Sequence, residues 1–219
     1  IVKLLATGYP EYNFPRNKKG NLSLGLAIVS SYLGLKSEDA HDALADSRMM
    51  LGIARHLKEE KPELLHAASV HGTKQGSLNM IQHSEDYMFS GKVNYGKEDR
   101  TPEVFCGQGN TRDTANIVAM FDLNFPPQDI LSMSEQELED GGIGKQGSPI
   151  KIYYLNQTLP LIPINSLNEY PNFALPHEEY CKRARLIKED DSFQGMVSNI
   201  LSKRVYRKSI PKTPEQGIY

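Results

Sequence analysis

The pattern of hydrophobic and polar positions predicts a helix near the N-terminus. Leu and Val recur at spacings of four, three and four residues within 22–33, which places them on one face of a helix. Gly34 follows the last of them, and glycine commonly ends a helix because it tolerates a left-handed backbone. Residues 1–20 mix apolar residues with Pro and Gly, so they are predicted to hold the end of a helix and then a loop.

A second predicted helix begins after Asp42 and has the clearest amphipathic pattern. Asp42 can accept a hydrogen bond from the first free backbone N–H groups, and Pro62 marks the end of the helix. The face expected to be buried consists of Leu44, Ser47, Met50, Leu51, Ala54 and Leu57.

Beyond position 71 the sequence changes to short β-like runs separated by turn residues. Gly, Ser, Thr and Asn become frequent, which predicts a small, mostly β domain ending near residue 167. One short helix is expected inside it, at 135–138. The β-like runs are residues 87–89, 103–106, 116–123 and 150–155.

Helical periodicity returns after residue 171, where Val197, Ile200 and Leu201 have helical spacing. The predicted fold class is therefore α+β. Three parts are expected, over residues 1–66, 67–168 and 169–219.

Composition and charge exclude several classes of protein. The 219 residues are 39% hydrophobic and 24% charged, which is enough to build a packed core. No apolar run approaches the roughly 18–20 residues of a membrane helix, so no membrane partner is expected. The formal net charge of −2 argues against a globally basic nucleic-acid-binding surface but leaves room for a local basic groove. The only cysteines, Cys106 and Cys181, are too few for a disulfide scaffold, which favours a cytoplasmic protein.

The strongest chemical candidate is the segment HDALAD at 41–46. His41 and Asp46 are five positions apart, so on one helix they would point about 140° away from each other. They converge if His41 lies in the loop before the helix and Asp46 lies one turn inside it. His41 can then deprotonate a water while Asp46 holds a divalent metal. Two exposed polar residues near a helix start explain the same spacing.

The sequence around this segment resembles the exonuclease I family, which belongs to the proofreading-type exonucleases with four acidic metal ligands and one histidine. The resemblance implies C-terminal helices of a ribonuclease H-like α/β exonuclease domain, then an SH3-like β domain, then the start of a helical domain. The matching stretches, in chain order, are 13–15, 22–35, 38–46, 54–58, 61–64, 116–123, 149–155 with Asn156, Pro160 and Leu167, and 176–206.

This resemblance implies hydrolysis of single-stranded DNA from its 3′ end to mononucleotides, with two Mg²⁺ ions. By motif match, His41 is the general base, Asp46 is the last metal-binding carboxylate, and Asp42 only caps the helix. The family's other three acidic ligands would precede Ile1, so we expect a chain cut at both ends and inactive alone. The resemblance also suggests a single-strand DNA-binding protein as partner, and we expect a monomer.

Further residues are candidates for DNA contacts. Arg16, Lys18 and Lys19 can bind phosphates, as can an excess of basic residues within 181–208. A solvated loop and an ordinary helix surface are the plainer explanations of these charges. The aromatic residues Tyr87, Phe89 and Tyr95 can stack on bases, although period-two aromatics such as the first two more often face a sheet core.

Two other functions fit parts of the sequence. The same modules can form a non-catalytic protein that binds single-stranded DNA or acts as a scaffold. Alternatively, His41-Asp42 can be the adjacent metal pair of an HD-type phosphohydrolase. An Asp42→Ala change separates these readings, because it removes metal binding in the HD case but otherwise weakens the helix by only about 1 kcal/mol.

Overall fold

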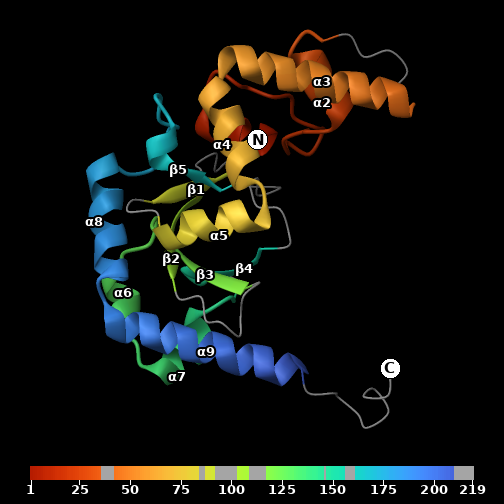
Figure 1. The fold of residues 1–219 in the computed structure, drawn as a ribbon. Coiled ribbons are helices and arrows are strands. Elements are labelled where there is room, and N and C mark those ends of the chain that lie inside the picture. Colours follow the sequence, from red (N-terminus) through yellow and green to blue (C-terminus); the bar gives the residue numbers. More distant parts are fainter. Residues whose placement is uncertain are drawn as a thin grey trace, which may run out of the picture. The chain divides into compact units, whose positions relative to one another are not determined.

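Helices and short antiparallel strands make up the computed structural model, which confirms the α+β class (Figure 1). It describes residues 1–35, 42–83, 87–91, 103–108, 117–145, 147–155 and 161–209. Within that part of the chain, no helix combines the length and the apolar character needed to cross a membrane. The chain forms two compact units. The first contains Ile1–Ser77, Met88–Glu103 and Leu159–Pro176, and the second contains Leu78–Tyr87, Val104–Thr158 and His177–Tyr219.

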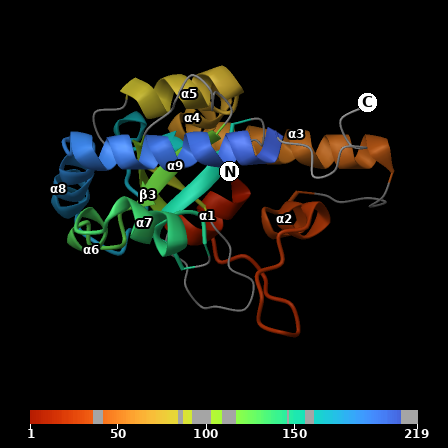
Figure 2. The same cartoon turned by 90° about the horizontal axis from the view of Figure 1, so that it is seen from below.

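Four helices begin the first unit: α1 (Val2–Gly8), α2 (Leu26–Tyr32), α3 (Ala43–Glu60) and α4 (Pro62–His71). Helix α2 packs beside α3, as Figures 1 and 2 show. Lys61 separates α3 from α4, and the proline that follows it starts α4, where a missing N–H costs nothing. The predicted helix stops at Gly34 and at Pro62 are therefore confirmed.

Helix α2 starts later than the periodicity predicts. Leu22 instead forms an antiparallel bridge with Arg16 and is buried there. Gly34 has φ +72, the left-handed conformation expected after the helix. The early part of the apolar pattern therefore belongs to a turn that packs on the unit, and only its later part is helical.

The predicted buried face of α3 is wrong except at Leu57. The helix buries a row spaced by four residues, Met49, Ile53 and Leu57, at 3–8% exposure. Leu44 and Leu51 are instead 56% and 51% exposed. The helix carries apolar residues on two sides, and spacing alone does not say which side meets α2.

The first unit also contains two paired strands and a short 3-10 helix. Strand β1 (Met88–Ser90) pairs antiparallel with β5 (Ile162–Pro163), and η3 (Ile164–Ser166) follows. Gly91 passes so close to α1 that an added Cβ would lie 2.3 Å from the backbone nitrogen of Leu4. Helix α4 contacts both β5 and η3.

Helix α5 (Lys74–His83) corrects the prediction of β structure from residue 71 onward. Its first turn is capped by Thr73, whose hydroxyl oxygen accepts from the backbone N–H of Gly76 at 3.0 Å. Gly76 and Ser77 are poor helix formers, which is why composition pointed to a turn. The capping threonine is the signal that identifies this helix in the sequence.

Three antiparallel strands lie in the second unit: β2 (Glu103–Gln108), β3 (Ile117–Asp122) and β4 (Ile150–Tyr154). Phe105 lies opposite Asp122, and Phe121 lies opposite Ile150. These strands and β1 correspond to the predicted β-like runs. The short helix expected at 135–138 is also present. The connection between β3 and β4 contains α6 (Gln128–Leu131), α7 (Glu135–Glu137) and η2 (Leu138–Gly142).

Two helices complete the second unit, α8 (His177–Lys188) and α9 (Asp191–Ser209). Helix α9 runs beside β3 and α7 (Figure 2). Its Val197, Ile200 and Leu201 are at most 1% exposed, which confirms the predicted helical face. The domain limits at residues 66 and 168 stay a prediction.

Candidate functional site

Asp46 lies in the first turn of α3, where the sequence places it. Its backbone N–H donates to the carbonyl oxygen of Asp42 at 2.9 Å, which is the opening hydrogen bond of the helix. Asp42 has the extended backbone of an N-cap residue, but its side chain makes no capping hydrogen bond. The half-buried Asp46 carboxylate lies near the positive end of the helix dipole, where a negative charge is favoured.

His41 and Tyr95 lie outside the described residues, and their roles stay predictions. Among the residues that are described, no three or more His, Cys, Asp or Glu side chains gather to hold a metal ion. A two-magnesium site needs several carboxylates together with substrate phosphate. The described residues around Asp46 therefore do not fit such a site by themselves.

The basic residues Arg16, Lys18 and Lys19 lie on an exposed hairpin. The Arg16 guanidinium donates to the carbonyl oxygen of Gly20 at 2.5 Å. The side-chain oxygen of Asn17 accepts from the backbone N–H of Lys19 at 2.9 Å. These local bonds fix the turn, so the three basic side chains are presented to solvent on an ordered loop.

Tyr87 and Phe89 are both fully buried. In the second unit, the Tyr87 ring packs 5.2 Å from that of Tyr180. In the first unit, Phe89 makes an edge contact with Phe173 at 5.4 Å. This placement agrees with the plainer interpretation of the two rings as core residues.

An ion-pair cluster that the sequence did not reveal surrounds Lys61 in the first unit. Its Nζ lies 2.5 Å from Glu169 and 3.1 Å from Glu11, and 4.5 Å above the ring of Tyr9. Burial tends to lower the pKa of Lys61, but the two carboxylates outweigh it and raise that pKa. Burial and the nearby Glu169 also raise the pKa of Tyr9. The partners are far apart in sequence, so no local signal marks them.

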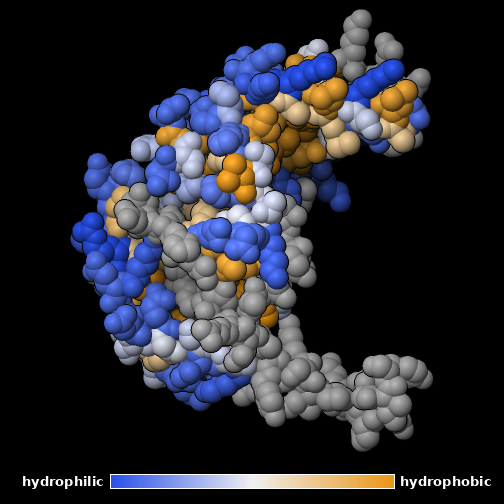
Figure 3. Space-filling view, in the orientation of Figure 1, coloured by the Kyte–Doolittle hydropathy of each residue, from blue (hydrophilic) through white to orange (hydrophobic). Residues whose placement is uncertain are grey.

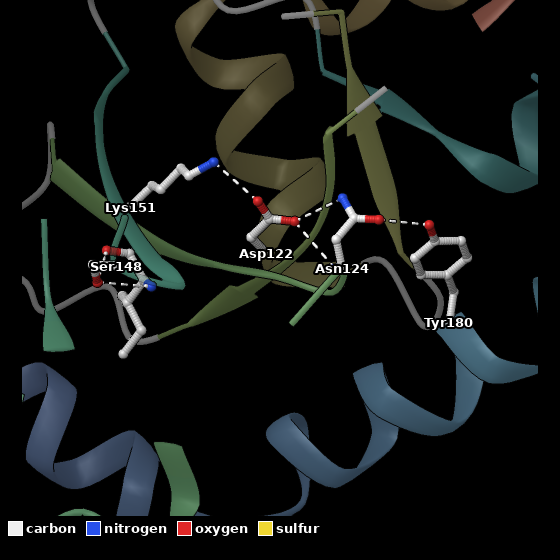
Figure 4. Close-up of polar contacts among 6 residues, drawn as sticks. Asp122, Asn124, Ser148, Lys151 and Tyr180 are labelled. Carbon is white, nitrogen blue, oxygen red and sulfur yellow. Dashed lines mark hydrogen bonds and ion pairs between the residues drawn. The ribbon is translucent and has the colours of Figure 1, made fainter. Parts of the chain in front are cut away.

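A buried carboxylate in the second unit accepts hydrogen bonds from several side chains (Figure 4). Asp122 is 4% exposed and accepts from Lys151 Nζ at 2.9 Å and from Asn124 Nδ2 at 2.9 Å. The Tyr180 hydroxyl donates to the side-chain oxygen of Asn124 at 2.7 Å. The chain of bonds links α8 to the end of β3 and provides the partners that a buried charge requires.

Basic residues of α8 and α9 also bind protein groups. Arg183 donates to Glu179 at 2.7 Å and to the carbonyl oxygen of Leu123 at 3.0 Å. Arg204 donates to the carbonyl oxygen of Ile143 at 3.0 Å. These two guanidinium groups therefore hold the helices to the strands and loops of the unit.

The fold is that of known nucleases. No family model matches the chain, and the curated proteins contain no significant relative. E. coli Exonuclease I in complex with a dT13 oligonucleotide matches with a TM-score of 0.71 and 18% identity, over 99% of this chain and 48% of that chain. Exonuclease I from Methylocaldum szegediense matches with a TM-score of 0.69 and 18% identity, over 96% of this chain and 48% of that chain.

An ExoI/SSB-Ct complex matches similarly, with a TM-score of 0.68 and 17% identity, over 91% of this chain and 45% of that one. The chain thus spans about half the length of the exonuclease I chains that it matches. At this identity the likeness establishes the fold. The chain has the fold of exonuclease I over nearly its whole length, which confirms the resemblance seen in its sequence.

Proposed function

We propose that this chain is part of a nuclease of the exonuclease I type, which degrades single-stranded DNA from the 3′ end to mononucleotides. The observation that carries this proposal is the structural likeness over 99% of the chain to an exonuclease I bound to an oligonucleotide. The sequence motifs that resemble the same family support it independently.

In this proposal, His41 is the general base that takes a proton from the attacking water. Histidine is the side chain that most often takes this role in enzymes. Asp46 supplies one metal-binding carboxylate, and its position in the first turn of α3 supports this role. Asp42 has the extended backbone of the residue that precedes α3.

Magnesium would supply the activated water and neutralise charge on the scissile phosphate. The described residues hold no cluster of carboxylates for two such ions, so the proposal requires further carboxylates from outside the described residues. We therefore expect the chain alone to be inactive as a nuclease. In this proposal the chain alone binds DNA but does not degrade it.

The exposed hairpin offers a first contact to DNA. Arg16, Lys18 and Lys19 can bind phosphates without reading bases. Each phosphate contact releases condensed counterions, so binding should weaken as salt rises. A single-strand DNA-binding protein is a second proposed partner, since one of the matched structures is an ExoI/SSB-Ct complex.

The alternative of a non-catalytic DNA-binding protein is favoured by one observation, the lack of a three-ligand metal cluster among the described residues. The HD-type alternative requires metal bound at Asp42. Because the Asp42 side chain makes no capping hydrogen bond, Asp42→Ala should cost even less helix stability than the sequence predicts. Loss of metal binding in that variant would support the HD reading and contradict ours.

A degradation assay tests the proposal. The full chain is incubated with Mg²⁺ and a 5′-labelled single-stranded oligonucleotide, as wild type, His41→Ala, Asp46→Asn and the matched control Glu59→Gln on the exposed side of α3. We expect binding without degradation in all four. Degradation abolished by His41→Ala and Asp46→Asn would support the nuclease roles and contradict inactivity of the chain alone. A chain that neither binds nor degrades the oligonucleotide would contradict the proposed function.

A further inference from the structure

Helix α3 carries a stripe of leucine and basic side chains on the side opposite its buried row. Five exposed positions, spaced alternately by four and three residues, lie within about 80° of one another around the helix axis. In Figure 3, hydrophilic and hydrophobic side chains lie next to each other along this helix. This surface, the outer stripe, consists of Leu44, Arg48, Leu51, Arg55 and Lys58.

The three cations of the outer stripe have no partner within the part of the chain that the structure describes. No side-chain hydrogen bond or ion pair joins Arg48, Arg55 or Lys58 to another described residue. On α3 itself, the acid that borders the stripe is Glu59, at one edge. The stripe therefore keeps an excess of positive charge, although the net charge of the whole chain is −2.

The composition of the stripe favours a polypeptide partner over a nucleic acid. Proteins that bind single strands combine cations with aromatic rings on which the bases stack. The outer stripe has no aromatic ring and instead alternates its cations with Leu44 and Leu51, which are 56% and 51% exposed. Leucines between charges match a partner that presents apolar side chains together with carboxylates.

The spacing of the stripe indicates the shape of that partner. Leu44, Leu51 and Lys58 are seven residues apart, a repeat that keeps one seam in contact when two helices pack together. Arg48 and Arg55 repeat at the same interval beside this seam. In paired helices, apolar residues fill the seam and the charges that flank it select a partner of opposite sign. The two arginines therefore match acidic residues on a second helix.

We propose that the outer stripe of α3 binds an amphipathic helix of another protein, one whose apolar face is bordered by Asp or Glu. The apolar face of that helix covers Leu44 and Leu51. Its carboxylates pair with Arg48, Arg55 and Lys58. The inference does not rest on the proposed nuclease function, because none of these five residues has a role there.

Fluorescence anisotropy of the full chain with two labelled synthetic peptides tests this proposal. Both peptides are helices of three heptads with leucines in the seam, and they differ only in carrying Glu or Lys at the flanking positions. We expect the Glu peptide to bind at least about tenfold more tightly than the Lys peptide at low salt, because only its charges complement the stripe.

Three variants locate the binding surface. The double variant Arg48→Glu, Arg55→Glu should weaken binding of the Glu peptide at least about tenfold and should favour the Lys peptide. Leu51→Ala should weaken binding of the Glu peptide about fivefold, because apolar contact is lost. The matched control Lys182→Glu, Arg185→Glu makes the same charge change on the exposed side of α8, and it should alter the affinity by less than about twofold.

Equal binding of the two peptides to the wild type would overturn the proposal, as would an unchanged affinity of the Glu peptide after charge reversal at Arg48 and Arg55. A labelled single-stranded oligonucleotide provides a further test. If the Glu peptide does not bind and the oligonucleotide loses its binding in the charge-reversed variant, the stripe binds nucleic acid and the proposal fails. Should that variant not fold, Leu51→Ala and the comparison of the two peptides on the wild type still decide.

Discussion

Helices α3 and α9 are nearly equal in length, 18 and 19 residues, but they bury their apolar side chains differently. On α3, Leu44, Met50 and Leu51 are 56%, 56% and 51% exposed. On α9, Phe193 and Val197 are fully buried. Hydrophobic surface is visible along α3 in Figure 3.

The two helices differ in whether other residues of their unit cover their apolar side chains. The described residues of the second unit enclose the apolar face of α9, because strand β3 and helix α7 pack on it. The described residues of the first unit leave one apolar side of α3 open. That open side is the face which the sequence pattern marks for burial. The apolar pattern of α3 therefore includes a face that the described residues leave exposed.

The largest expected effect is at the enclosed helix. Replacing Phe193 with Ala removes a fully buried ring from α9 and should lower the free energy of unfolding by about 3–5 kcal/mol. Denaturant titration followed by circular dichroism measures this change. A loss below about 1 kcal/mol would show that α9 is not packed as described.

Gly91→Ala should destabilise the first unit by about 2–3 kcal/mol, because the added methyl group meets the backbone of α1 rather than a movable side chain. Gly195→Ala, in the open part of α9, is the matched control. It should leave stability unchanged or raise it by up to about 1 kcal/mol. Thermal melts of both variants make the comparison, and equal melting temperatures would contradict the close approach at Gly91.

The cluster around Lys61 should make stability depend on alkaline pH. A lysine whose pKa is raised on folding stabilises the protein fully below its unfolded pKa of about 10.4 and loses that contribution as pH rises through its folded value. The free energy of unfolding should therefore fall above about pH 10. The raised pKa of Tyr9 acts in the same direction, with an unfolded pKa of about 10.

Lys61→Met removes the ion pairs and should cost about 1–2 kcal/mol at pH 7, since both partner carboxylates are more than half exposed. Its stability should also fall less steeply with alkaline pH than that of the wild type. Urea titrations at pH 7, 9 and 10.5 test both statements. Parallel pH profiles for the two proteins would contradict the role of Lys61.

The smallest expected effect is at the open helix face. Leu51→Ala should change the free energy of unfolding by no more than about 0.5 kcal/mol, because the side chain is half exposed and both residues favour helix. The same denaturant titration as for Phe193→Ala applies. A loss above about 2 kcal/mol would mean that this face is covered within the chain, and the contrast with α9 would disappear.

The sequence predicts best where one apolar face and clear end signals coincide. The buried residues of α9 follow from their spacing, and the break between α3 and α4 follows from Pro62. The predicted buried face is wrong at α3, because that helix has two apolar sides. Helix α5 was not predicted, because Gly76 is typical of a turn, although Thr73 caps the helix. Such ambiguities are settled by packing, which a single sequence does not contain.

The sequence likewise predicts some features of the candidate site and misses others. Asp42 correctly predicts the start of α3 and hence the first-turn position of Asp46, although its side chain makes no capping hydrogen bond. The carboxylates that pair with Lys61, and the lysine that pairs with Asp122, come from distant positions in the sequence. Local patterns locate a side chain along its helix but do not reveal which distant groups it meets.

Binding of labelled oligonucleotides to the full chain tests the central claim most directly. Fluorescence anisotropy compares a single strand with a duplex of the same length at 50 and 200 mM salt, for the wild type and for a variant with Arg16, Lys18 and Lys19 replaced by Gln. We predict preferential binding of the single strand, weaker binding at the higher salt concentration, and a smaller salt dependence in the variant. Failure to bind the single strand at low salt, or equal binding of the duplex, would contradict the assignment of this chain to a single-strand nuclease.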